Sequence, residues 1–281
     1  MQAEATVAGA ERDLFREFEQ QGWEAACRTY TTAFSSLTRQ TAPVLLAAVS
    51  AGTDTFLLDV ATGPGVLAEE GARLGARVVG LDFSVGMLRL ARISGSEVQL
   101  VAGDAERLPF SDSIFDAVTM NYCLLHLSRP EVALREAYRV LRPDGVCAFS
   151  AWRPPAETAG FRIILDALDN QGDLTGGVPA GPPFFQSGDP DWADAALSAA
   201  GFRAIGLTTV VQSWELNGPD DLFDAFLYGT ARTGGLLRTQ SEGAKVRIRA
   251  AVQEAVERYR DAAGQVVLPM PALVAWGVRQ Q

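Results

Sequence analysis

The chain has 281 residues, enough for one large domain or for a core with a modest cap. Hydrophobic residues make up 48% of the sequence and charged residues 21%, a balance that excludes an intrinsically disordered protein. The net charge of −10 disfavours a nucleic-acid partner, because binding to phosphates needs a cationic face and the arginines here are scattered singly.

The cysteines and the N-terminal residues indicate the compartment. Cys27, Cys123 and Cys147 lie far apart without C-x-x-C spacing, which argues against a disulfide framework or a zinc site, and we expect no metal. Charged residues such as Glu4 occupy the place where a signal peptide needs an apolar run, and the uncharged apolar stretch 43–52 is too short to span a bilayer. We expect a reduced, cytoplasmic protein without a membrane partner, and leave the oligomeric state open.

Short apolar runs alternate with helix-like stretches through the first half of the chain. Helical spacing of apolar residues predicts helices within 11–50. Ser84 is placed to N-cap a helix over 85–93, and Ser128-Arg-Pro-Glu131 fits a capping box. The predicted strands are 56–60, 77–82, 97–101, 115–121 and 146–152, further helices are 66–74 and one ending at 141–142, and 143–145 is a turn. This alternation predicts a parallel sheet covered on both faces.

The pattern loosens after Trp152. Prolines and glycines interrupt the next stretch, which suggests an irregular insertion up to residue 190. The expected elements beyond it are a helix at 192–200, a long strand at 202–216, two helices within 219–262 and a final strand at 265–278.

The strongest local motif is Asp59-Val-Ala-Thr-Gly63-Pro-Gly65. It places two glycines just past the first strand, where the backbone must approach a ligand closely. Asp82 ends the second strand and is well placed to accept hydrogen bonds from two ribose hydroxyls. Taken alone the motif is ambiguous, because residues 63–68 also satisfy the dinucleotide pattern G-x-G-x-x-G/A with a downstream acid.

A third acid helps to decide between a dinucleotide and another adenosine-containing cofactor. Asp104 stands just after the third strand, where it can accept from an adenine amino group, and Phe115-Asp116 then leads the fourth strand toward Asn121. This ordered set resembles the class I S-adenosylmethionine-dependent methyltransferases of the ubiquinone/menaquinone-biosynthesis type, densely over residues 56–152. The set is far more specific than the glycine motif alone.

The resemblance implies a fold and a domain layout. The expected fold is α/β, a Rossmann-like seven-stranded, mostly parallel sheet with helices on both faces, plus an N-terminal helical cap and lid insertions. The expected segments, within one structural domain, are a helical cap (1–50), the cofactor-binding core (51–152), an insertion or lid (153–190), a core helix and strand (191–217), a helical lid insertion (218–263) and a final core strand (264–281).

The resemblance also implies a cofactor, S-adenosyl-L-methionine, with S-adenosyl-L-homocysteine as product. Asp59 and the Ala61–Gly65 loop would hold the methionine amino end and the adenosine, Asp82 the ribose, and Asp104 the adenine amino edge. Ala61 stands where many relatives have glycine, and Pro64 stiffens the loop, but the acids are retained. The residues expected to bind the cofactor are Tyr30, Arg39, Asp59, Ala61, Gly63, Gly65, Asp82, Phe83, Met87, Asp104, Ala105 and Asn121.

The expected reaction is in-line transfer of a methyl group to a small, hydrophobic or natural-product-like acceptor, on O, N or C, as in secondary metabolism. His126 is the only histidine and a candidate general base, although it also fits a histidine packed beneath the following helix. Aromatic residues at helical spacing more often belong to a hydrophobic core than to a binding site, but as a set these suit an apolar acceptor cavity. The candidate acceptor-binding residues are Trp23, Phe34, Tyr122, Phe184, Phe185, Phe226 and Arg232.

Other functions stay open. A protein of this fold could bind the cofactor yet catalyse a non-methylating reaction, such as a cyclisation, or act as a regulator. Modification of protein or nucleic acid is disfavoured by the acidic composition. A dehydrogenase ranks last, because the only lysine, Lys245, lacks the tyrosine four positions before it that short-chain reductases need.

Overall fold

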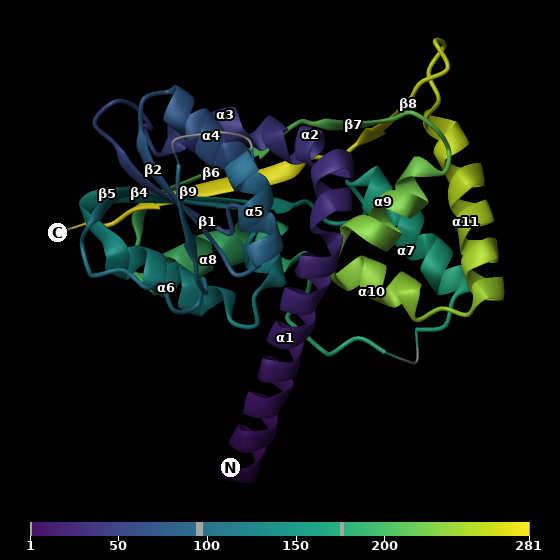
Figure 1. The fold of residues 1–281 in the computed structure, drawn as a ribbon, viewed down its shortest axis with the longest axis horizontal. Coiled ribbons are helices and arrows are strands. Elements are labelled where there is room, and N and C mark those ends of the chain that lie inside the picture. The colour runs from purple at the N-terminus through teal and green to yellow at the C-terminus, as the bar shows by residue number, and fades with distance from the viewer. Residues whose placement is uncertain (1, 94–97, 175–176, 281) are drawn as a thin grey trace. The chain divides into compact units, whose positions relative to one another are not determined.

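The computed structural model describes residues 2–93, 98–174 and 177–280, and the chain divides into two units (Figure 1). The unit that we call the sheet unit comprises Thr38–Trp152, Gly181–Val210 and Ala272–Gln281, and the helical unit comprises Met1–Leu37, Arg153–Ala180 and Val211–Pro271. The boundary between the two units along the chain falls within the helix α2 (Ser35–Thr38), because Leu37 belongs to the helical unit and Thr38 to the sheet unit.

The sheet unit is built on seven strands in the order β3-β2-β1-β4-β5-β9-β6. The strands are β1 (Phe56–Val60), β2 (Arg77–Asp82), β3 (Gln99–Ala102), β4 (Phe115–Asn121), β5 (Leu141–Trp152), β6 (Arg203–Val210) and β9 (Ala272–Val278). Strands β1 to β5 pair in parallel, and only β9 runs antiparallel, against both β5 and β6. The predicted Rossmann-like, mostly parallel seven-stranded sheet is confirmed.

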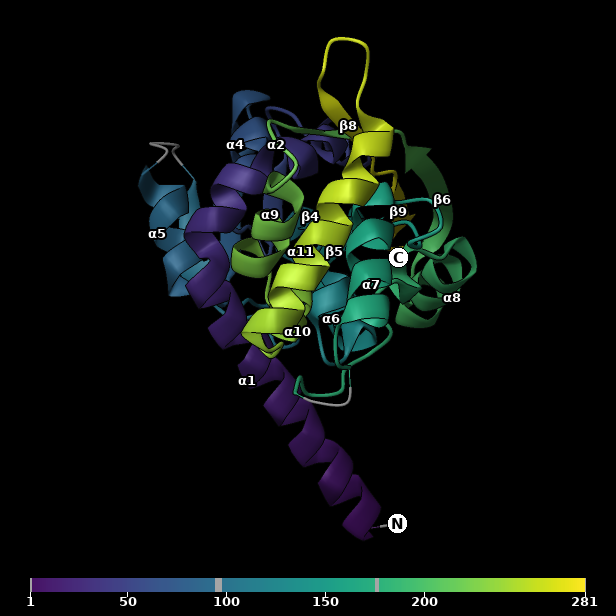
Figure 2. The same ribbon diagram turned by 90° about the vertical axis from the view of Figure 1, so that its right-hand side faces the viewer.

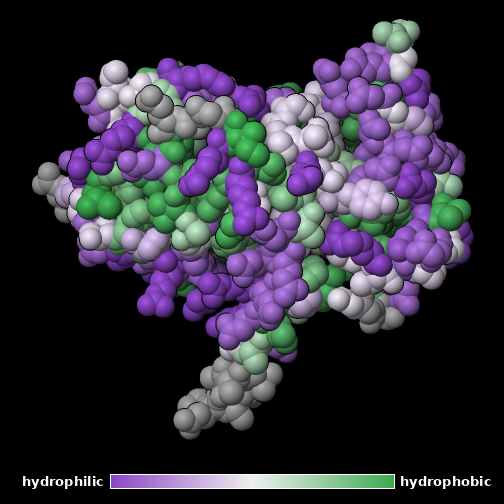
Figure 3. Space-filling view, in the orientation of Figure 1, coloured by the Kyte–Doolittle hydropathy of each residue, from purple (hydrophilic) through white to green (hydrophobic). Residues whose placement is uncertain are grey.

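Helices cover both faces of this sheet because its central strands are apolar in both directions. On β1, Leu57 packs with α3 and α4, whereas Leu58, on the opposite face, belongs to a second buried cluster with α6 and α8. The helices of this unit are α3 (Ala42–Ala48), α4 (Val66–Arg73), α5 (Val85–Ile93), α6 (Pro130–Val140) and α8 (Pro190–Ala200), with the short 3-10 turns η1 (Arg39–Thr41), η2 (Leu124–His126) and η3 (Gln186–Gly188). Figure 3 shows hydrophobic residues gathered on the face of this unit that is turned to the viewer. Among the residues of α5, Val85 and Ile93 are exposed.

The helical unit contains five longer helices and a two-stranded sheet among its described residues. Its elements are α1 (Gln2–Ala33), α7 (Ala159–Gln171), α9 (Asp221–Gly229), α10 (Arg232–Arg238), α11 (Glu242–Val256), the turn η4 (Glu257–Tyr259), and β7 (Ser213–Leu216) paired with β8 (Val266–Pro269). In the part of the chain that the structure describes, no helix combines the length and the apolar character needed to cross a bilayer.

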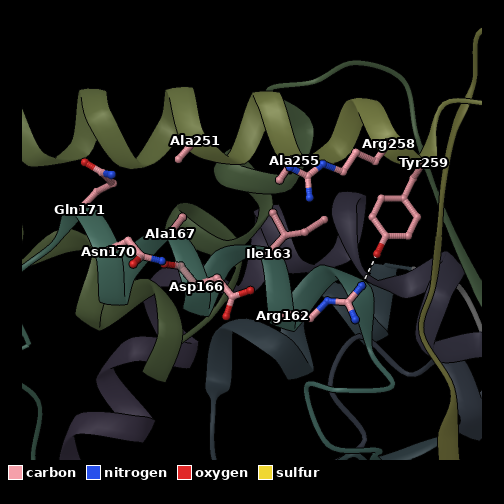
Figure 4. A pocket seen from close by; sticks show the side chains of 10 residues that line it. All are labelled: Arg162, Ile163, Asp166, Ala167, Asn170, Gln171, Ala251, Ala255, Arg258 and Tyr259. Atoms are coloured by element: carbon pink, nitrogen blue, oxygen red, sulfur yellow. Dashed lines mark hydrogen bonds between the residues drawn. The ribbon is translucent and has the colours of Figure 1, made fainter.

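Helices α7 and α11 lie side by side (Figure 2). Small side chains, Ala167 and Ala251 among them, leave an open groove of about 430 Å³ between the two helices. At one end of it, Arg162 donates a hydrogen bond to the Tyr259 hydroxyl (Figure 4). Charged residues, Arg162, Asp166 and Arg258, also line the groove, which belongs wholly to the helical unit.

Several elements differ from the sequence predictions in the second half of the chain. The single strand expected over 202–216 is two strands, β6 and β7, in different sheets, and the final strand expected over 265–278 is likewise β8 and β9. The break between β8 and β9 falls at Pro269 and Pro271, which lack the N–H groups that a continuous hydrogen-bond ladder requires. The stretch expected to be irregular up to residue 190 contains α7, and three helices rather than two follow β7.

The predicted helix caps had mixed outcomes. The Ser84 hydroxyl accepts from the Met87 amide at 3.1 Å, as expected for an N-cap of α5. The capping box over 128–131 is wrong, because the Ser128 hydroxyl donates instead to Glu106 at 2.8 Å and Arg129 precedes the helix. Helix α6 ends at Val140, and the predicted turn at 143–145 lies within β5. Glu97, expected in the third strand, lies outside the described residues.

Candidate functional site

The candidate site lies where four neighbouring parallel strands end. Strands β3, β2, β1 and β4 are adjacent in this order, so their carboxyl ends meet at one edge of the sheet. Asp59 is the last residue but one of β1, Asp82 ends β2, and Asn121 ends β4, while Asp104 follows β3 by two residues. The sheet therefore brings together the acids that the sequence analysis singled out.

Asp59 is buried beneath the loop rather than open on it. The residue is only 1% exposed. Its two carboxylate oxygens accept hydrogen bonds from the hydroxyls of Thr62 at 2.7 Å and Thr119 at 2.9 Å. Burial raises the pKa of Asp59 to about 7, although the hydrogen bonds from the two threonines oppose this rise and the nearby charge of Asp82 adds to it. The carboxyl group thus titrates near neutral pH.

The loop after β1 is held in an unusual backbone conformation. Ala61, Gly63 and Gly65 all have positive φ angles, of 56°, 55° and 88°. A side chain at Gly65 would lie 3.2 Å from the Ala91 methyl group, whereas nothing lies within 4 Å of the place where a side chain at Gly63 would begin. The open space at Gly63 is what close approach of a ligand to the backbone requires.

Asp82 fastens this loop to the end of β2. One of its carboxylate oxygens accepts from the Gly63 amide at 2.8 Å, and the other accepts from the Ser84 amide at 2.8 Å. The Thr62 amide also donates to the Leu81 carbonyl at 2.9 Å, so two successive loop residues are tied to β2. The loop and the second acid form one hydrogen-bonded unit.

The third acid organises its own turn. The Asp104 carboxylate accepts from the Glu106 amide at 2.9 Å, and its carbonyl accepts from the Arg107 amide at 3.0 Å. The next residue, Ala105, is buried. Phe83, half-buried, and Met87, buried, lie after β2 at the start of α5, in the same unit as this turn.

Asn121 lies at the centre of a polar cluster at the end of β4. Its side-chain oxygen accepts from the Ser150 hydroxyl at 2.5 Å and lies 2.8 Å from the Thr41 hydroxyl, while its amide group donates to the Thr38 carbonyl at 3.2 Å. Asn121 therefore anchors the chain around η1 to the sheet edge.

Aromatic residues lie at the ends of β4 and β5 and around His126. The Tyr122 ring stacks on Trp152 with 4.1 Å between ring centroids. His126 ends η2 and meets the Phe184 ring edge to face at 5.7 Å, and Phe184 in turn meets Phe185 at 4.9 Å. The structure brings His126 and two of the predicted acceptor residues together within the sheet unit.

Arg39, expected to bind the cofactor, has an ion-pair partner. Its guanidinium donates to Glu70, which also accepts from Arg73 at 2.7 Å. Burial raises the pKa of Glu70, but the hydrogen bonds from Arg73 and Arg39 outweigh it and hold that pKa below its ordinary value. Arg39 therefore lies in a partly exposed salt bridge between η1 and α4.

The remaining predicted residues belong to the helical unit. Phe34, 3% exposed, packs its ring 4.6 Å from Trp214 and 5.6 Å from each of Tyr30 and Phe226. Trp23 continues the cluster, meeting Tyr30 at 5.3 Å. The structure thus brings the predicted aromatic residues of this unit together as its core.

Arg232 and a buried glutamate border this aromatic cluster. Burial lowers the pKa of the Arg232 guanidinium, and the charge of Glu19 opposes that shift. The Glu19 residue is fully buried and accepts from the Trp23 indole at 3.1 Å. The buried Glu19 beside this aromatic cluster was not predicted.

The sequence reasoning also missed residues of the sheet unit. Thr62 and Thr119, the hydrogen-bond donors to Asp59, were not singled out, although Thr62 stands inside the glycine motif. Glu106, two residues after Asp104, is buried and accepts several hydrogen bonds. Only its position two residues after Asp104 in the sequence could have drawn attention to it.

Residues 58–149 match the methyltransferase domain family, a stretch that runs from β1 into β5 and includes Asp59, Asp82, Asp104 and Asn121. Together with the sheet order, this match defines the protein as a class I S-adenosylmethionine-dependent methyltransferase, an enzyme whose cofactor is S-adenosyl-L-methionine.

Comparison with known proteins gives the family more closely. The chain is 39% identical over 177 residues to the demethylmenaquinone methyltransferase of Renibacterium salmoninarum, covering 62% of this chain and 75% of that protein. It is 34% identical over 169 residues to the Streptomyces griseus demethylmenaquinone methyltransferase, covering 58% and 73%. The chain therefore belongs to the class I methyltransferases of the ubiquinone/menaquinone-biosynthesis type.

A solved structure shows the same fold at low sequence identity. The phosphoethanolamine N-methyltransferase 2 of Haemonchus contortus, in complex with phosphomonomethylethanolamine and S-adenosylhomocysteine, superposes with a TM-score of 0.57 at 17% identity, covering 95% of this chain and 60% of that one.

The pKa of Asp59 predicts a pH-dependent stability. Between the ordinary value of 3.8 and about 7, the folded state keeps a proton that the unfolded state has lost, so ionisation of this carboxyl opposes folding as the pH rises. Relative to Asp59→Asn, the free energy of unfolding of the natural protein should fall by up to about 1.4 kcal/mol per pH unit in this range.

Urea unfolding of both proteins from pH 4 to pH 8 measures this difference. A carbon-13 titration of the Asp59 carboxyl, with a midpoint near neutral pH, provides an independent check. Burial would not control the pKa of this group if the difference in unfolding free energy between the two proteins did not change with pH and the carbon-13 titration of Asp59 had its midpoint near pH 4.

Proposed function

We propose that the enzyme transfers the methyl group to a small, hydrophobic acceptor with an aromatic or quinone ring, of the natural-product type. The observation that carries the proposal is the gathering of Asp59, Asp82 and Asp104 around a loop with open space at Gly63, with aromatic residues at the neighbouring strand ends. A cytoplasmic location is part of the same proposal.

The residues present fit the cofactor. Asp82 offers two carboxylate oxygens at the end of β2, suited to two ribose hydroxyls, and the backbone at Gly63 is unobstructed. Asp104 and Ala105 would read the adenine edge, with Phe83 and Met87 beside the ring. Asn121 would line the methionine end, together with Ala61 and Gly65 of the loop.

The structure supports a different role for Asp59 than direct contact with the methionine amino group. Both of its oxygens accept hydrogen bonds from threonine hydroxyls, and the residue is almost fully buried. We therefore assign Asp59 to fixing Thr62, and through it the loop that cradles the cofactor. Arg39 would act similarly, by holding η1 against α4.

The acceptor would meet the aromatic residues beside the ends of β4 and β5. Tyr122, Phe184 and Phe185 offer apolar ring surface next to His126, in the sheet unit. The relatives named above are demethylmenaquinone methyltransferases, which favours a quinone-like ring. The other residues predicted to contact these ligands, Trp23, Tyr30, Phe34, Phe226 and Arg232, lie in the helical unit, where the aromatic rings pack on one another.

The bound cofactor supplies a methyl group on a positively charged sulfur. The protein's part is to align acceptor and methyl group and to exclude water, which can lower the barrier by roughly 7–11 kcal/mol in favourable cases. With the cofactor bound, its methyl group would pass from sulfur to the acceptor, and the acceptor would lose a proton in exchange. His126, half-buried at the end of η2, is the proposed proton acceptor.

A methyl-transfer assay tests the function. The protein is incubated with methyl-labelled S-adenosylmethionine and either a reduced, unmethylated naphthoquinone or phosphoethanolamine. We expect label in the naphthoquinol, with one S-adenosylhomocysteine released per methyl group. Label in the polar amine instead would overturn the proposed acceptor class, and cofactor binding without S-adenosylhomocysteine release from any acceptor tried would favour a non-methylating role.

Replacing Asp82 tests the cofactor site. Asp82→Asn loses charge and leaves an amide donor facing the Gly63 or Ser84 N–H, so the Kd for S-adenosylhomocysteine should rise about 10- to 100-fold, the usual cost of a charged hydrogen bond. Titration calorimetry measures it. The control Asp54→Asn changes an exposed aspartate before β1 and should bind normally; equal affinities for all three proteins would refute the assignment.

Replacing His126 tests the proposed base. His126→Asn should lower kcat at least about 100-fold, with an unchanged Kd for the cofactor, because only proton transfer is lost. Phe184→Leu, which removes the ring packed on His126 but no proton acceptor, should change kcat by only a few-fold. Near-normal turnover by His126→Asn would mean that the histidine is only packed there.

A further inference from the structure

Glu106 is a buried carboxylate that accepts three hydrogen bonds. One oxygen accepts from the Ser128 hydroxyl at 2.8 Å and from the Arg129 amide at 2.8 Å, and the other accepts from the Arg129 guanidinium at 2.7 Å. Only 3% of its side chain is exposed, compared with 50% for Arg129. A charge so deeply buried keeps one position, because any movement would break hydrogen bonds that water cannot replace.

On one side, Glu106 belongs to the turn that carries Asp104. Its own amide donates to the Asp104 carboxylate at 2.9 Å, and the Arg107 amide closes the turn on the Asp104 carbonyl. The orientation of the Asp104 side chain therefore depends on where Glu106 is held. Ala105, the other residue proposed to meet the adenine, lies between the two acids.

On the other side, Glu106 holds the segment that carries His126. Its partners, Ser128 and Arg129, are the second and third residues after His126, and they connect η2 to the start of α6. The Ser128 hydroxyl is used for this contact instead of capping α6, which explains why the predicted capping box does not form. The η2 segment is thereby tied to the turn after β3.

We infer that Glu106 is a positioning residue that joins the cofactor side of the site to the acceptor side. It holds the turn of Asp104 and the segment of His126 in one fixed relation, so that adenine binding and the placement of the reacting groups depend on the same carboxylate. This inference rests on the proposed function, because that function assigns Asp104 to the cofactor and His126 to the acceptor.

Glu106→Gln tests the inference. The glutamine keeps the shape of the side chain, but its NH₂ group faces a hydrogen-bond donor of Ser128 or Arg129 where a carboxylate oxygen accepted before. We expect the Kd for S-adenosylhomocysteine to rise about tenfold and kcat at saturating cofactor to fall about tenfold. If Glu106 supported only the turn that carries Asp104, Glu106→Gln would raise Kd and leave kcat unchanged. A merely structural role would lower the melting temperature and change neither. Either of these two results would overturn the inference.

The chain offers a matched control on the same segment. Glu136 on α6 also accepts from one backbone amide, that of Leu108 at 2.8 Å, and from one guanidinium, that of Arg139. It holds Leu108, four residues beyond Asp104, and these two hydrogen-bond partners both lie away from the segment of His126 in the sequence. Glu136→Gln should therefore lower stability while leaving Kd and kcat within about twofold of the natural protein.

A double-variant cycle shows whether Glu106 acts through Arg129. If it does, Glu106→Gln combined with Arg129→Met should raise Kd no more than the stronger single change, whereas fully additive effects would contradict the coupling. Should Glu106→Gln fail to fold, Ser128→Ala removes a single neutral donor, and a two- to fivefold rise in Kd with a matching fall in kcat is expected. No change in either quantity would contradict the inference.

The same measurements separate this inference from the proposed function. If the natural protein does not bind S-adenosylhomocysteine, the proposed cofactor site fails. If it binds and turns over but Glu106→Gln behaves identically, only the inference fails.

Discussion

The hydrogen bond from the Gly63 amide to Asp82 is the interaction on which the rest of the site depends. It fixes the loop after β1 to the end of β2, and Asp59 fixes the preceding residue of the same loop from below through Thr62. These contacts exist only because β1 and β2 are parallel neighbours, which brings their carboxyl ends to the same edge. The loop is thus shaped by two carboxylates before any ligand arrives.

This arrangement has an electrostatic cost. Asp59 loses its hydration, and the two threonine hydroxyls offset only part of that loss, which is why its pKa lies near 7. Ala61, with a left-handed backbone that an alanine seldom adopts, adds local strain. Ala61 lies within the loop that is proposed to cradle the cofactor and Asp59 lies directly beneath it, where a preorganised backbone favours binding.

Several other carboxylates of the sheet unit also hold the backbone by accepting hydrogen bonds from main-chain amides. Asp82, Asp104, Glu106 and Glu136 each accept from at least one main-chain amide in a segment that follows a strand. The acidic composition that disfavours a nucleic-acid partner therefore has a partly structural explanation. Several of the negative charges are buried in loop contacts at the sheet edge and not displayed on the surface.

The sequence by itself determined the alternation of strands and helices, and with it the sheet and the positions of Asp59, Asp82 and Asp104 at strand ends, because these features follow from local periodicity. Only the tertiary structure decided which distant groups the buried polar side chains meet: Ser128 with Glu106, Arg39 with Glu70, Asn121 with Thr38. It also divided two predicted strands between separate sheets. Such partners are chosen by the packing of elements far apart in the chain, and no local pattern encodes that packing.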